Sequence, residues 1–193
     1  VLICESWLNN NEDAFAAVKL IKSDINTGTS ANCNRGVKAA NGEWIKIIAG
    51  DDALYPNAIQ QYIDFINQQN NPEIKIIQTN MDIFAYIFSS ENFIKTDDLS
   101  GLYQTKNEAT AIQQFEIMIR DPHLNSPSLF IKRSVYSEAG FYDEKYTLME
   151  DFPWLLNALR VGIKIYFINF SSVKYRKTVS SVQISKAKNV FVS

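Results

Sequence analysis

The chain has 193 residues, of which 46% are hydrophobic, and its formal net charge is −2. This length suits one well-buried domain, and the near balance of charge, without a basic stripe, argues against a nucleic-acid partner. No run approaches the roughly 20 apolar residues of a membrane-spanning helix. The two cysteines, Cys4 and Cys33, make neither a disulfide framework nor a zinc-binding CxxC pair, and they favour a reducing, cytoplasmic compartment.

The first half of the chain alternates short apolar runs with helical stretches. The predicted strands, rich in apolar and β-branched residues, are residues 1–4, 18–22, 43–49 and 74–78. The predicted helices are residues 30–40 and the stretch that Pro56 and Asn57 open. Strands that alternate with helices of this length indicate a parallel α/β sheet covered on both faces.

The second half is less regular. Residues 83–93 are expected to be extended, and further strands are predicted at residues 128–132 and 164–168. Apolar residues at helical spacing predict helices over residues 107–120 and 152–161. No internal repeat divides the chain, which favours a single domain.

Two adjacent carboxylates, Asp51 and Asp52, follow the strand predicted at residues 43–49 and precede the helix that Pro56 opens. Ligands of parallel α/β sheets collect outside the carboxyl ends of the strands. The two carboxylates repel each other and favour a positive partner, and Mg²⁺ commonly takes one or two carboxylates together with substrate phosphates. The alternative is a solvated turn in which one aspartate caps the next helix.

A second acidic pair, Glu150 and Asp151, lies at the start of the helix predicted at residues 152–161. The helix dipole favours negative charge there, so Asp151 can be a simple N-cap, with Pro153 tolerated in the first turn. The other interpretation is a general base placed against a hydroxyl acceptor.

A turn containing Gly28 leads into the helix at residues 30–40, which carries Asn34. Backbone N–H groups at such a turn are well placed to bind an anion. A well-capped helix without a ligand is the other interpretation.

Taken in this order, the segments resemble family 2 glycosyltransferases of the GT-A fold. The matching positions are Gly28, Ser30, Asn34, Gly36, Ala40, Gly42-Glu43-Trp44-Ile45, Asp51-Asp52 and Pro56. The matching downstream segments are residues 139–144, similar to a Gly-Phe-Asp-Glu loop, then Glu150-Asp151 and Tyr175-Arg176. The resemblance spans residues 1–176 and implies a single GT-A-like α/β domain with a mixed, mostly parallel sheet flanked by helices.

The resemblance also divides the chain and assigns roles to residues. It implies a nucleotide-sugar-binding half at residues 1–80, an acceptor-binding half at residues 81–176 and a tail at residues 177–193. Asp151 would be the catalytic base, supported by Glu150, and Asp52 would bind Mg²⁺ or Mn²⁺ against the diphosphate. The residues implied to contact the nucleotide-sugar donor are Asp51, which would meet its ribose or uracil, Asn34, Gly28 and Glu5.

The implied activity is the inverting transfer of a sugar from a UDP-sugar to a carbohydrate or lipid-linked acceptor, in the synthesis of bacterial surface polysaccharide. The implied location is the cytoplasm, with peripheral association at the inner face of the membrane. Two alternatives stay open. A nucleotidyltransferase shares the α/β sheet and a carboxylate-bound metal, although no Gly-rich basic loop is visible near the amino terminus. The other is a catalytically inactive domain that binds a nucleotide sugar.

The chain departs from the family pattern near its amino terminus. No segment before Val1 supplies the family's opening strand, so we expect this amino-terminal strand to be missing. The Asp-rich turn that binds the nucleotide base is represented only by Glu5, and the short interval to Lys22 leads us to expect missing residues between Glu5 and Ser6. Ala49 and Cys33 replace an acidic residue and an arginine that the family often carries.

Two other residues invite a functional reading. His123, the only histidine, lies in a loop beside Asp121 and is expected to be a surface hydrogen-bonding group, with a place beside the sugar site as the alternative. Trp154 is expected to pack in the core, and stacking on an acceptor sugar is its alternative role.

Overall fold

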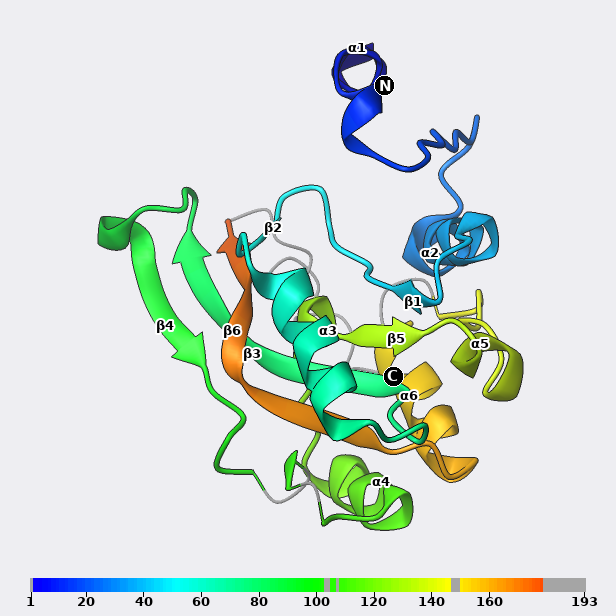
Figure 1. The fold of residues 1–193 in the computed structure, drawn as a ribbon, viewed down its shortest axis with the longest axis vertical. Coiled ribbons are helices and arrows are strands. Elements are labelled where there is room, and N and C mark those ends of the chain that lie inside the picture. The colour runs from blue at the N-terminus through cyan, green and yellow to red at the C-terminus, as the bar shows by residue number, and fades with distance from the viewer. Residues whose placement is uncertain (1, 103–104, 107, 147–149, 179–193) are drawn as a thin grey trace, which may run out of the picture.

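The computed structural model describes residues 2–102, 105–106, 108–146 and 150–178, and Figure 1 shows their arrangement. Nearly all of the tail predicted at residues 177–193 lies outside these residues, and the division into a donor half and an acceptor half stays a prediction. None of the helices in the described ranges is long and apolar enough to cross a membrane.

The described strands form one mixed sheet. Their bounds are β1 Trp44–Ile45, β2 Ala53–Leu54, β3 Ile76–Ala85, β4 Phe93–Asp97, β5 Phe130–Lys132 and β6 Ile165–Lys177. The order is β1-β5-β3-β6-β2, and β4 pairs with β3 beside this path. Strands β3 and β6 are parallel, from Ile76 opposite Ile165 to Ala85 opposite Lys177.

A mixed sheet was predicted and is confirmed, but less of it is parallel than expected. The described pairs β1–β5, β3–β5, β3–β4 and β2–β6 are all antiparallel. One reason is that β4 returns from β3 as a hairpin, which joins antiparallel strands. The other is that β5 is inserted between β1 and β3, and both pair with it antiparallel.

Helices cover the sheet on both sides. Their bounds are α1 Leu2–Asn10, α2 Gly28–Ala39, α3 Ala58–Gln69, α4 Ala111–Arg120, α5 Val135–Glu138 and α6 Asp151–Arg160. Short 3₁₀ turns are η1 Glu12–Ala14, η2 Ser90–Asn92 and η4 Ser126–Ser128. A capping box formed by Thr110 and Gln113 fixes the start of α4, because each side chain bonds the other's backbone N–H.

Alternate residues of the central strands face two separate hydrophobic clusters. Ile76 of β3 lies beside Ile131 and Ile165, and all three belong to the cluster that contains α4, α5 and α6. The neighbouring residue of each strand, Ile77, Phe130 or Tyr166, belongs to the cluster beneath α3. Successive side chains of a strand point to opposite faces, so α3 covers one face, and α2, α4, α5 and α6 supply residues to the cluster on the other (Figure 1).

The strand predicted at residues 1–4 is wrong, because residues 2–10 form helix α1. No residue of α1 is buried, and Figure 1 shows this helix standing apart from the sheet. An apolar run becomes a strand only when a neighbouring strand satisfies its backbone groups, whereas a helix satisfies them internally. The strand expected at residues 18–22 is also absent, since the structure gives these residues no regular conformation.

The remaining sequence-based elements differ mainly in their ends. The strand expected at residues 43–49 is paired only at Trp44–Ile45, and the one expected at residues 128–132 begins with the η4 turn. Strands β3 and β6 are longer than predicted because each pairs with the other over most of its length.

We expect Ile76→Ala to lower the free energy of unfolding by about 2–5 kcal/mol, because Ile76 is fully buried and its removal leaves a cavity. Urea unfolding followed by circular dichroism measures this change. The matched control is Ile94→Ala in β4, where the side chain is 51% exposed and the change is expected to stay within about 0.5 kcal/mol. Equal losses in the two variants would contradict the two-cluster description.

Candidate active site

The acidic pair Asp51–Asp52 lies in the loop between β1 and β2. The backbone N–H of Asp52 donates to the carbonyl of Ala49 at 3.2 Å, which closes a turn just before β2. Strand β2 pairs with β6, with Ala53 opposite Lys174. This pairing brings the acidic pair next to Arg176, far along β6.

The carboxylate of Asp52 is half-buried and only partly satisfied. Its Oδ1 accepts a hydrogen bond from the backbone N–H of Arg176 at 2.9 Å, whereas its Oδ2 is buried and has no hydrogen-bond partner among the described residues. Burial raises the pKa of Asp52, and the charge of Asp51 adds to the rise. The Arg176 hydrogen bond and the charges of Arg176 and Lys46 oppose it. The free oxygen is thus a site for a further partner.

Arg176 joins the acidic loop to the hairpin between β3 and β4. Its Nε donates to the carbonyl of Asp51 at 2.8 Å, and its Nη1 donates to the carbonyl of Tyr86 at 3.2 Å. Its guanidinium carbon lies 4.5 Å from the ring centroid of Phe88. The loop with the two aspartates and the hairpin are therefore held by the same side chain.

Lys46 follows β1 directly and lies between the acidic loop and η4. Its Nζ donates to the carbonyls of Pro127 and Leu129, the latter at 3.0 Å. Burial lowers the pKa of Lys46 to about 7, and the nearby charge of Asp52 opposes this shift. A lysine buried in this way is close to the balance between its charged and neutral forms at neutral pH.

The second carboxylate, Asp151, is the first residue of α6. Its Oδ2 accepts a hydrogen bond from the hydroxyl of Ser126, and its Oδ1 accepts one from the backbone N–H of Phe152 at 2.7 Å. Each carboxylate oxygen thus accepts one hydrogen bond, and a carboxylate has further lone pairs left for a third partner.

Both acidic pairs have a neighbour in or bonded to η4. Lys46, whose pKa the charge of Asp52 affects, donates to the carbonyl of Pro127, and the neighbouring Ser126 donates to Asp151. The turn η4 therefore contacts Asp151 directly and bonds a lysine in the field of Asp52. That the two pairs serve one site stays a prediction.

A network of buried hydroxyl groups holds η4 in place. The hydroxyl of Tyr62 donates to the carbonyl of Ser128, and the hydroxyl of Ser172 lies 2.8 Å from the Tyr62 oxygen. The hydroxyl of Ser128 donates to the carbonyl of Thr79 at 2.8 Å and accepts from its N–H at 3.1 Å. Each of the four side chains is essentially fully buried, so η4 is fixed to α3, β3 and β6 at once.

Glu150 lies just before α6 and is close to Cys33 of α2. Burial raises the pKa of Glu150, and the charge of Asp151 adds to the rise. Burial also raises the pKa of the Cys33 thiol to about 11, with further contributions from the charges of Glu150 and Asp151. Cys33 is therefore a neutral thiol beside the second acidic pair.

Asn34 is engaged inside the protein. Its amide nitrogen donates to the carbonyl of Tyr142 and to the carboxylate of Glu144, both at 2.9 Å, and its Oδ1 accepts from the N–H of Tyr142 at 3.0 Å. These bonds fix α2 to the loop before α6. Its predicted contact with the donor stays a prediction, since both amide hydrogens already have partners.

The other two residues implied to contact the donor lie in different surroundings. Gly28 opens α2 with φ of 86°, and its N–H is taken by the side chain of Asn26 at 3.0 Å. Glu5 lies in α1 and forms an ion pair with Lys22. The strand-end position from which Glu5 was assigned is wrong, because residues 2–10 are helical.

His123 lies on the surface and Trp154 packs in the core, as expected from the sequence. His123 is exposed, and its Nδ1 lies 3.2 Å from the carboxylate of Asp121. Trp154 is buried, stacks on Tyr136 with ring centroids 4.9 Å apart, and donates from Nε1 to the carbonyl of Gly140 at 2.7 Å.

The described residues contain no group of three His, Cys, Asp or Glu side chains that could hold a metal ion by themselves. A metal at Asp52 would need further ligands from a bound substrate. The unpartnered Oδ2 of Asp52 fits that use, because a hard cation binds carboxylate and phosphate oxygens together.

The sequence did not identify Lys46 or Ser126 as residues of the site. It identified Arg176 as a matching position but predicted no contact for it. Lys46 is a charged residue within the apolar run at residues 43–49, and this was the one sequence feature that could have indicated a role in the site. Ser126 carried no signal, because its role depends on where η4 meets α6.

The family model described as Glycosyl transferase family 2 matches residues 3–127. This match covers well over half of the chain, which therefore belongs to glycosyl transferase family 2.

Individual relatives agree with this assignment. An uncharacterized glycosyltransferase of Rickettsia typhi is 24% identical over 151 residues, which are 78% of this chain and 45% of that protein. The succinoglycan biosynthesis protein ExoO of Rhizobium meliloti is 25% identical over 147 residues, which are 75% of this chain and 41% of that protein. The chain thus spans less than half the length of these two relatives.

The fold is similar to that of Staphylococcus aureus TarS. A crystal structure of a TarS fragment has a TM-score of 0.64 at 13% sequence identity and covers 89% of this chain and 47% of that one. A crystal structure of the same fragment in complex with UDP-GlcNAc has a TM-score of 0.64 at 14% identity, with 90% and 46% covered. At these identities the similarity establishes the GT-A-like fold.

We expect stability to depend on pH through Lys46. Its pKa of about 7 in the folded chain lies well below that of an unfolded lysine, so between pH 7 and about 10.4 the unfolded state binds more protons at this site. The free energy of unfolding should therefore gain a contribution that rises with pH across this window. Urea unfolding at pH 7 and pH 9.5 should show a smaller rise in Lys46→Met than in the parent chain.

The control for this measurement is Lys19→Met, which removes an exposed lysine with the same change of charge. In this control, the free energy of unfolding should change between pH 7 and pH 9.5 as much as it does in the parent chain. A rise in Lys46→Met as large as in the parent would contradict the burial of this ammonium group.

Proposed function

We propose that this chain is the catalytic domain of an inverting glycosyltransferase that moves a sugar from a UDP-sugar to a hydroxyl group of a carbohydrate or lipid-linked acceptor. The observation that carries the proposal is the presence of both acidic pairs within a chain of glycosyl transferase family 2, with Asp151 bonded to η4 and Asp52 near Lys46, which also bonds η4. One carboxylate would serve the donor and the other the acceptor.

In the proposed reaction, Asp151 is the general base. The acceptor hydroxyl gives its proton to a free lone pair of the Asp151 carboxylate while its oxygen forms a bond to the anomeric carbon. The bond between the anomeric carbon and the diphosphate oxygen breaks, and UDP leaves with the electron pair. Because the attack comes from the side opposite the leaving group, the anomeric centre is inverted.

The hydrogen bonds from Ser126 and Phe152 orient the base. They hold both carboxylate oxygens in fixed directions, which is what a base needs to meet one particular hydroxyl group. The raised pKa of Glu150 makes it a neighbour that carries a proton more readily than an exposed glutamate does. Glu150 is therefore proposed to support the base or to bond the acceptor.

On the donor side, Asp52 would hold Mg²⁺ or Mn²⁺ through its unpartnered Oδ2, and Asp51 would contact the nucleoside. A bound divalent ion would offset the negative charge of the departing diphosphate. Arg176 keeps the backbone of this loop in place through Asp51.

The choice of UDP-sugar and of surface polysaccharide rests on similarity. TarS has been crystallised with UDP-GlcNAc and with UDP, and ExoO is a succinoglycan biosynthesis protein. Peripheral association with a membrane is part of the same proposal, since a lipid-linked acceptor would lie at its surface.

We expect Asp151→Asn to lower the rate of transfer by at least about 100-fold, because an amide cannot accept the proton. UDP release from UDP-glucose, UDP-galactose and UDP-N-acetylglucosamine, with water and simple disaccharides as acceptors, measures the rate. The matched control is Asp64→Asn on the exposed surface of α3, which should leave the rate unchanged. Undiminished transfer by Asp151→Asn would remove this residue from the mechanism, and UDP binding without transfer by the parent would favour an inactive binding domain.

We expect Mn²⁺ to strengthen UDP binding through Asp52. A ligand that binds only the folded chain raises the melting temperature, so UDP with Mn²⁺ should raise Tm more than the sum of either alone. Differential scanning fluorimetry measures this excess, and Asp52→Asn should abolish it while Asp64→Asn keeps it. An excess of the same size in Asp52→Asn would place the metal elsewhere.

A further inference from the structure

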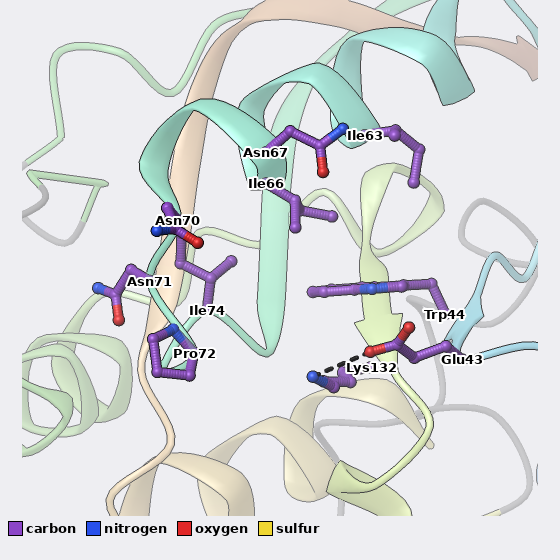
Figure 2. A pocket seen from close by; sticks show the side chains of 10 residues that line it. All are labelled: Glu43, Trp44, Ile63, Ile66, Asn67, Asn70, Asn71, Pro72, Ile74 and Lys132. Atoms are coloured by element: carbon purple, nitrogen blue, oxygen red, sulfur yellow. Dashed lines mark ion pairs between the residues drawn. The ribbon is translucent and has the colours of Figure 1, made fainter.

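A concave region lies at the carboxyl end of α3, and we call it the α3 groove. It has a volume of about 380 Å³. Figure 2 shows its lining residues, which are Glu43, Trp44, Ile63, Ile66, Asn67, Asn70, Asn71, Pro72, Ile74 and Lys132. None of these residues belongs to the two acidic pairs or to η4.

The groove lies at the other end of the sheet from the candidate active site. Strand β5 starts next to η4 and ends at Lys132, which lines the groove. Strand β3 likewise starts just after the groove segment at residues 70–74, and its far end leads to the hairpin held by Arg176. The lengths of these strands therefore separate the two regions.

Trp44 supplies an aromatic surface to the groove. Its ring stacks on Phe130 with centroids 5.2 Å apart and planes 14° apart, and Phe130 stacks on Tyr62 at 4.8 Å. Trp44 is thus the outer member of a three-ring stack whose inner members are buried. In Figure 2 the indole projects into the groove between Ile66 of α3 on one side and the Glu43–Lys132 pair on the other. Its position is fixed before any ligand arrives.

Side-chain amides line the opposite wall. Asn67 and Asn70 are exposed, and their side chains form no hydrogen bond with the described residues. Asn70 ends α3 in the left-handed conformation, with φ of 43°, which turns the chain across the end of the groove. Each amide offers both a donor and an acceptor, which matches a hydroxyl group that also does both.

The charge of the groove is balanced. Glu43 and Lys132 are its only charged lining residues, and they pair at 3.1 Å. A phosphate or another anion would find no uncompensated cation here. The lining therefore favours a neutral ligand that has an apolar face for the indole and isoleucines and a rim of hydroxyl groups for the amides.

We infer that the α3 groove binds a neutral saccharide, at a place separate from the transfer site. A pyranose ring has such an apolar face of C–H bonds and such a rim of hydroxyl groups. Ile66 and the edge of the Trp44 indole contact the apolar face, because Phe130 stacks on the indole ring and the Nζ of Lys132 lies 6.0 Å from its centroid. Asn67, Asn70 and Glu43 bond the rim. Binding here requires no donor, no metal and no turnover, so the inference stands or fails independently of the proposed reaction.

The test is a titration of the whole chain with cellobiose, maltose, lactose and N,N′-diacetylchitobiose, with binding followed by tryptophan fluorescence and by saturation-transfer NMR. We expect saturable binding of at least one disaccharide. Asn67→Ala combined with Asn70→Gly keeps the Trp44 reporter and suits the left-handed backbone at position 70, and it should weaken binding at least tenfold. Gln68→Ala combined with Gln69→Ala, outside the lining on the same helix end, should leave the affinity unchanged.

Several outcomes would overturn the inference. They are the absence of saturable binding by all four disaccharides, equal affinity in the two double variants, and competition by uridine as strong as by the disaccharide. Dimerisation that buries Trp44, detected by analytical ultracentrifugation of the parent and Trp44→Ala chains, would assign the groove to a second copy instead. The Asp151→Asn variant should bind the disaccharide as the parent does, which separates this site from the proposed catalytic one.

Discussion

The arrangement of the candidate site depends on the buried hydroxyl network around Ser128. Buried polar groups are costly unless they are hydrogen-bonded, and this network satisfies its members only when α3, β3, β6 and η4 are together. The turn that results presents the carbonyl of Pro127 to Lys46 and the hydroxyl of Ser126 to Asp151. A polar cluster in the core thus positions the turn that bonds both Lys46 and Asp151.

Local signals in the sequence predicted much of the architecture. Helices α3 and α6 follow from apolar residues at helical spacing, and the two acidic pairs were identified because each stands at the end of one element and the start of another. The order of motifs further indicated the family, which the match over residues 3–127 confirms. These features depend on neighbours in sequence, which is why they could be predicted without coordinates.

The features that the sequence did not reveal depend on long-range pairing. Residues 1–4 have a strand-like composition, but residues 2–4 belong to helix α1. The order of the strands, with β5 between β1 and β3, also decides how much of the sheet is parallel. Burial lowers the pKa of Lys46, and the carbonyl that it bonds in η4 lies eighty-one residues later in the chain.

Strand β5 has a consequence for the size of ligand that the molecule can use. Its three residues span roughly 10 Å at about 3.4 Å per residue, with Ser126–Ser128 before it and Lys132 at its end. A monosaccharide would be too short to reach both proposed places, whereas an oligosaccharide would be long enough. Chain length would then count in recognition, because an extended glycan gains a second point of attachment that its individual units lack.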